Sequence, residues 1–199
     1  MILGEYNVDC RWSPAMHLAL WGGVLCFLAG FWMPVSWCYE NGPVEYLQLA
    51  CMGGIVFLCC RSTQYREFFL WCAAVMLLLM LREINCGRTL FFAYPDSSVR
   101  FYKWSEIPYG WVVQTCYGVL IAVTVLWFFV RKLFMRVPQV LRMRPLPIGC
   151  VGILLTEIII ARVCETDGAL MVWEELAELS VVVTGLIVAG LYSGMRCSR

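Results

Sequence analysis

Three carboxylates stand close together just before the last long apolar segment of the sequence. Glu174, Glu175 and Glu178 fall within residues 170–180, and residues three or four positions apart lie on one side of a helix. A charge at membrane depth is costly, so such groups usually face a protein interior or a water-filled cavity. Carboxylates in that setting could bind a cation, exchange a proton or hold a polar ligand.

Other polar residues fall near the same end of the predicted helices, which indicates a shared polar cup above an apolar floor. Acids at helix starts also complement the helix dipole, which would explain Glu45, Glu174 and Glu175 without any function. Glu157 and Glu178 lie past the first turn, so they are the candidates for proton or cation handling. The predicted polar cup consists of Glu45, Gln48, Arg82, Glu83, Glu157, Arg162, Glu174, Glu175 and Glu178.

The composition is typical of an integral membrane protein. Hydrophobic residues make up 61% of the 199 residues and charged residues 15%, whereas soluble domains average about half and about 25%. The net charge of +1 gives no reason to expect a nucleic-acid partner. The lipid bilayer is therefore the first partner that the sequence predicts.

Apolar segments predict one all-α transmembrane domain, residues 1–199, in which about six membrane-spanning helices form a bundle and position these polar groups. The predicted spans are 16–37, 45–60, 67–81, 110–130, 147–163 and 172–194. The second, third and fifth are short, so a four-span arrangement with re-entrant pieces stays open. Ten Lys or Arg residues fall on one side of the six spans and five on the other, which predicts cytoplasmic N- and C-termini.

Two long connections between the predicted spans differ in character. Residues 83–109 are rich in Trp, Tyr and Phe, which favour the membrane–water interface, and we expect them to cover the outer mouth of the bundle. Residues 131–146 are basic, and we expect them to contact anionic headgroups at the cytoplasmic face or to bind a cytoplasmic protein partner. The basic cytoplasmic surface consists of Arg131, Lys132, Arg136, Arg142 and Arg144.

Residues typical of metal and nucleophilic sites are poorly placed in this sequence. The single histidine, His17, lies far from the predicted cup, no His or Cys pair has metal-ligand spacing, and no cofactor-binding motif occurs. We therefore expect no metal and no cofactor, and no catalytic residue can be named. Cys38, Cys86 and Cys164 fall on the outer side, where three cysteines permit one disulfide without defining the pair.

These observations favour a small non-enzymatic membrane component that acts as a sensor, an assembly factor or a partner-binding subunit. A second hypothesis is a channel or transporter for a cation, a proton or a small solute, with Glu157 and Glu178 as its binding groups. A third is a membrane enzyme that acts on lipid-like substrates. Composition places the chain most simply in a bacterial inner membrane, and glycines in the spans could serve internal packing or a homo-oligomer.

Overall fold

The long elements of the structure are all helices. The computed structural model describes residues 8–9, 13–39, 41–91, 102–143, 146–165 and 170–193, and for these the predicted all-α class is confirmed. Three of the helices, α2, α5 and α8, are long and apolar enough to cross a membrane. The long helices are α1 (Pro14–Ala29), α2 (Pro43–Arg61), α3 (Arg66–Glu83), α5 (Gly110–Val130), α7 (Ile148–Cys164) and α8 (Met171–Ser193).

Shorter elements connect the long helices. Residues 131–146, predicted as a basic loop, contain two short helices, and residues 83–109, predicted as an aromatic loop, contain two more before residue 92. Arg144 and residues 92–101 lie outside the described residues. Two strands of two residues each pair in parallel. The short elements are β1 (Val8–Asp9), η2 (Val35–Trp37), η3 (Asn85–Gly87), α4 (Arg88–Phe91), η4 (Leu133–Met135), α6 (Val137–Met143) and β2 (Leu146–Pro147).

The first helix is shorter than the predicted span 16–37. Ser13 caps its start, because the Ser13 hydroxyl accepts the backbone N–H of Met16 at 3.3 Å, and Pro14 fills the first helical position. The helix ends at Ala29, and the turn that follows leads to Pro34, which disfavours a helical residue before it. The other five long helices begin and end within two residues of their predicted ranges.

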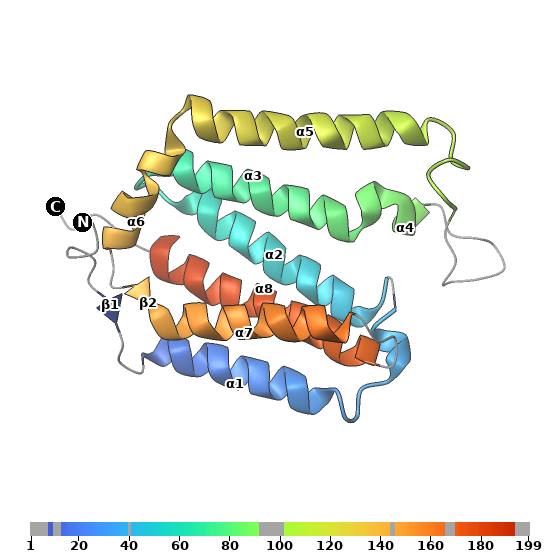
Figure 1. Ribbon diagram of the computed structural model, residues 1–199, viewed down its shortest axis with the longest axis horizontal. Helices are drawn as coiled ribbons and strands as arrows, with labels where there is room; N and C mark the ends of the chain where they lie inside the picture. The colour runs from blue at the N-terminus through green and yellow to red at the C-terminus, as the bar shows by residue number, and fades with distance from the viewer. Residues whose placement is uncertain are drawn as a thin grey trace.

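Helix α8 lies inside the bundle, and the other long helices are arranged around it or beyond it (Figure 1). It contacts α1, α2 and α7 directly, while α3 packs against α2 and α5 packs against α3 at the outer edge. The buried side chains follow this arrangement, since α8 contributes Leu176 and Leu179 to one core cluster and Tyr192 to another. Residues on different faces of α8 can therefore meet different helices.

Alternating helix directions bring the polar ends of several helices together. Figure 1 shows α4 at one end of the bundle, here termed the α4 end, and α6 with the β1–β2 pair at the other, the α6 end. Helices α2 and α8 begin at the α4 end and α3 and α7 end there, so Glu45, Arg82 and Glu174 lie near it. The basic residues at the α6 end include Arg61, Arg66, Arg131, Lys132, Arg136 and Arg142.

Helix α5 makes its main contacts among the long helices with α3. The Trp71 Nε1–H donates to the backbone carbonyl of Thr124 at 2.9 Å, and the Tyr117 hydroxyl donates to the carbonyl of Leu78 at 3.1 Å. The ring centroids of Trp71 and Phe128 lie 4.6 Å apart. No residue in the most apolar stretch of α5 is buried, so these contacts with α3, together with those to η3 and η4, hold the helix against the bundle.

Replacing Tyr117 by Phe removes the hydroxyl bond to Leu78 and leaves the ring in place. We expect the free energy of unfolding in mild detergent to fall by about 0.5–1.5 kcal/mol, the net contribution of one hydrogen bond. Tyr109→Phe is the matched control, because Tyr109 is 75% exposed, and it should leave stability unchanged. Equal stability of the two variants would show that the hydroxyl bond does not hold α5 in place.

Candidate functional site

The pocket between α2, α3, α7 and α8 collects charged residues at the α4 end, and we call it the four-helix pocket. Its volume is about 300 Å³. Met52 and Ile55 continue its wall along α2 toward the α6 end, so the charged groups adjoin apolar surface. The polar side chains that line it are Gln48, Arg82, Glu83, Arg162, Glu165 and Glu178.

A buried amide joins α2 to the first turns of α8. Gln48 is 2% exposed, and its Nε2 donates to the backbone carbonyl of Glu175 at 3.0 Å and to the Glu175 carboxylate at 3.4 Å. A buried amide without partners costs about 1–3 kcal/mol, so this contact favours one way of packing α2 against α8. The contact positions the helices that carry the four-helix pocket.

The four-helix pocket holds charges of both signs. Arg162 forms an ion pair with Glu165, three residues later at the end of α7, and Glu178 interacts electrostatically with Arg82 and Glu83. Three acids and two arginines line the pocket, which gives it a net charge of −1 when all are ionised. A ligand or partner with positive or mixed charge would fit this field better than an anion.

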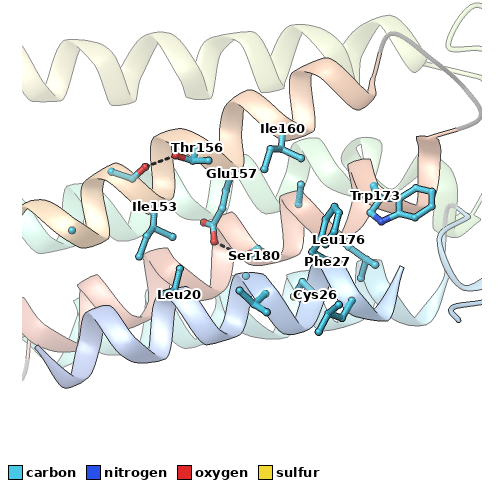
Figure 2. A pocket seen from close by; sticks show the side chains of 16 residues that line it. Leu20, Cys26, Phe27, Ile153, Thr156, Glu157, Ile160, Trp173, Leu176 and Ser180 are labelled. Carbon is cyan, nitrogen blue, oxygen red and sulfur yellow. Dashed lines mark hydrogen bonds between the residues drawn. The ribbon is translucent and has the colours of Figure 1, made fainter. Parts of the chain in front are cut away.

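A second and larger pocket lies on the other side of α8, between α1, α7 and α8, and we call it the α1–α7–α8 pocket (Figure 2). Its volume is about 540 Å³, and its walls are largely apolar. Glu157 reaches into it from α7 and is 6% exposed. Ser180 donates a hydrogen bond to Glu157 Oε1, and Thr184 donates to the same oxygen at 3.3 Å.

Two polar atoms at this pocket, Glu157 Oε2 and Trp173 Nε1, have no hydrogen-bond partner among the described residues. Gly23 of α1 and Gly30, which caps the end of α1, allow a close approach to both side chains. A Cβ atom at Gly23 would lie 2.9 Å from Glu157 Oε1, and one at Gly30 would lie 2.6 Å from Trp173 Nε1. A larger residue at either position would therefore displace the polar group beside it.

The residues of the predicted polar cup are distributed over both sides of α8. The sequence analysis did not identify Glu165, Ser180, Thr184 or Trp173 as site residues. For Ser180 and Thr184 the sequence did carry a signal, because two hydroxyl residues four positions apart in an apolar helix lie on the same face. Glu45 instead accepts the backbone N–H of its near neighbour Asn41 at 2.5 Å. The four-helix pocket contains Gln48, Arg82, Glu83, Arg162 and Glu178, the α1–α7–α8 pocket contains Glu157, and Glu45, Glu174 and Glu175 line neither.

The three cysteines that could have formed a disulfide are free thiols. Cys38, Cys86 and Cys164 are unbridged, so the disulfide that the sequence permits is not present in this structure. Burial raises the pKa of the Cys38 thiol, and the nearby Glu175 carboxylate raises it further. Burial also raises the pKa of the Cys86 thiol. Both are therefore protonated near neutral pH and are poor nucleophiles.

Part of the predicted basic surface is held by neighbouring side chains. Arg131 forms an ion pair with Glu67 at the start of α3, and Arg136 donates to Gln139 at 3.1 Å. Leu133 of η4 is 1% exposed, and η4 contacts α5 and α6. The segment therefore lies at the α6 end of the bundle, and neighbouring side chains hold two of its arginines in place (Figure 1).

Comparison of the chain with protein-family models, curated proteins and solved structures finds no match. Within the described ranges, no group of three or more His, Cys, Asp or Glu side chains is arranged to hold a metal ion. Function must therefore be inferred from the two pockets and from the helix bundle that carries them.

Removing the Gln48 amide tests the contact between α2 and α8. Gln48→Leu leaves the Glu175 carboxylate without this donor, and we expect the free energy of unfolding to fall by about 1–3 kcal/mol. Gln114→Leu makes the same chemical change at an exposed position of α5, so it should alter stability by less than about 0.5 kcal/mol. Unfolding in mild detergent measures both, and a loss no larger than that of the control would contradict the assigned role.

Proposed function

We propose that this protein is a multispanning membrane protein. The three apolar helices support this, because 19, 21 and 23 residues give about 28–35 Å of helix, enough for a hydrocarbon core of about 30 Å. The mean hydropathy of +0.74 and the exposed apolar side chains of α5 agree with that setting. Helices α1, α3 and α7 run alongside the other three, and we infer that they cross the membrane too, which gives six spans.

The basic residues support an orientation in which the α6 end faces the cytoplasm. Lys132 and Arg136 flank Phe134 and Met135, which are 47% and 56% exposed. Apolar side chains between basic ones suit contact with a leaflet that contains anionic lipids, and a cytoplasmic protein partner at the same surface is the alternative. This orientation fits a bacterial inner membrane, with the α4 end outside.

Within that membrane we infer a non-enzymatic role, as a sensor or partner-binding subunit whose recognition site is the four-helix pocket. The observation that carries this proposal is that five charged side chains, from α3, α8 and the end of α7, line one pocket at the α4 end. Charged groups at membrane depth need a partner or water, and these groups share one space. A positively charged or zwitterionic solute, or a polar segment of a partner protein, would complement their charge.

Transport of a cation or proton through Glu157 and Glu178 receives less support from the geometry. These two side chains line pockets on different sides of α8. A single path that used both would have to pass around or through that helix. Recognition at one pocket requires no such path, so it is the simpler proposal.

Labelling of single cysteines in intact cells tests the proposed orientation. In a cysteine-free background, Ser105→Cys lies at the α4 end and Thr63→Cys at the α6 end, and both positions are exposed. We expect an impermeant maleimide to label Ser105→Cys from outside, and Thr63→Cys only after the membrane has been opened. Any other pattern, including labelling of both positions from outside, would contradict the proposed topology.

Thermal unfolding with a panel of ligands tests the four-helix pocket. Divalent cations, polyamines, amino acids and anionic lipids are added to the purified protein in mild detergent. A ligand that binds only the folded state raises stability by about 2.7 kcal/mol at about 100 times its Kd. We expect a positively charged or zwitterionic ligand to do so.

The rise in stability caused by the ligand should be lost in Glu178→Gln, because this change removes an acid from the four-helix pocket. It should persist in Glu67→Gln, an acid at the opposite end of the bundle with about half of its side chain exposed. The absence of any shift, or a shift of equal size in both variants, would contradict the assignment of this pocket as the recognition site.

A further inference from the structure

The α1–α7–α8 pocket contains a strong hydrogen-bond acceptor that has no donor. Glu157 is 6% exposed, and its Oε2 has no hydrogen-bond partner within the described chain. None of the described residues that line the pocket is Lys, Arg or His. Because burial of an unpaired polar or charged group is costly, a donor from outside the chain that reached this oxygen would stabilise it.

The bonds to the other oxygen of Glu157 indicate which kind of donor fits. Ser180 and Thr184 both donate to Oε1, and such bonds are stronger when the acceptor carries a negative charge. Charged groups inside a membrane usually pair with a group of opposite charge. A ligand that carries a protonated amine would supply this charge together with the missing donor.

A second unpartnered atom lies at the same pocket, since the Trp173 Nε1–H has no acceptor among the described residues. Trp173 and Ser180 are seven residues apart on α8. Gly23 of α1 adjoins Glu157, and Gly30, the residue that caps the end of α1, adjoins Trp173. Seven residues of helix rise by about 10.5 Å, so Trp173 and Ser180 lie about two turns apart along α8, where Figure 2 labels both.

Exposed apolar side chains border the pocket. Phe27 and Leu28 of α1 and Ile160 of α7 line it, and they are 51%, 43% and 37% exposed. These side chains belong to the lateral surface of the bundle, which faces lipid if the chain spans the membrane as we propose. This step rests on that proposed location, and it gives a lipophilic molecule a route of entry from the bilayer.

We propose that the α1–α7–α8 pocket binds a lipophilic amine, with its ammonium group against Glu157 and its apolar chain along α1 and α7. The pocket volume of about 540 Å³ lies within the usual range of small-molecule sites. A hydrogen-bond acceptor farther along the same ligand would complement the Trp173 Nε1–H. The site is separate from the four-helix pocket, so it adds a ligand to the proposed recognition role.

Photolabelling of the full-length protein in lipid nanodiscs tests this proposal. The probe is dodecylamine with a diazirine in its chain, and mass spectrometry identifies the labelled peptides. We expect saturable labelling of α1 and α7 that excess dodecylamine removes and excess dodecanol, a neutral molecule of equal chain length, does not. Equal competition by dodecanol, or labelling that does not saturate, would overturn the proposal.

Matched variants separate the carboxylate from general effects on folding. Glu157→Gln keeps the size of the side chain and should weaken labelling about tenfold or more, because a charged hydrogen bond is lost. Glu67→Gln removes an acid at the opposite end of the bundle, which lines neither of these two pockets, and should leave labelling unchanged. Undiminished labelling of Glu157→Gln would overturn the proposal.

A second pair of variants serves if Glu157→Gln does not fold. Ile160→Trp fills the pocket from its border and should block labelling, whereas Ile159→Trp adds the same bulk outside the pocket and should not. Labelling that survives Ile160→Trp would overturn the proposal. The ligand shift expected at the four-helix pocket depends on Glu178, so failure at one site is distinguishable from failure at the other.

Discussion

The hydrogen bonds from Ser180 and Thr184 to Glu157 determine how the centre of the bundle is built. They join α7 to α8 through a buried carboxylate, and the two donors to its Oε1 offset part of the cost of burying such a group in apolar surroundings. Helix α1 can approach the same carboxylate because Gly23 has no Cβ atom. Another side of α8 meets α2, where the buried amide of Gln48 makes the corresponding polar contact. Helix α8 is thus fixed by polar contacts to two different neighbours.

The central position of α8 explains why the bundle has two pockets of different character. The four-helix pocket includes the C-terminal ends of α3 and α7, so it gathers charges that flank their apolar segments. The α1–α7–α8 pocket is lined mainly by apolar side chains of three helices, so it is apolar apart from the groups around Glu157. Helix α5 lies outside this arrangement, and side chains of α3 and α5 bind carbonyls of the facing helix. The same constraint acts at the two pockets and at the contact between α3 and α5: polar groups in apolar surroundings need partners.

Hydropathy predicts the helices well and the site only in part. Apolar runs place five long helices within two residues of the observed ends. They predict a first helix that is too long, because residues 31–37 are mostly apolar although Gly30 and Pro34 are turn signals. Alternating helix directions also predict that polar residues gather at one end. Hydropathy does not give the rotation of a helix about its axis, which decides that Glu157 and Glu178 face different neighbours. For the same reason it could not reveal the unpartnered Trp173 Nε1–H.

A double-mutant cycle between Glu157 and Ser180 tests most directly whether this buried contact joins α7 to α8. The free energy of unfolding is measured in one lipid-like medium for the wild type, Glu157→Leu, Ser180→Ala and the double variant. Leu replaces Glu157 with a side chain of similar size that cannot accept a hydrogen bond. We predict a favourable coupling energy of about 0.5–1.7 kcal/mol between the two positions. A coupling energy indistinguishable from zero would contradict the central place given to this contact.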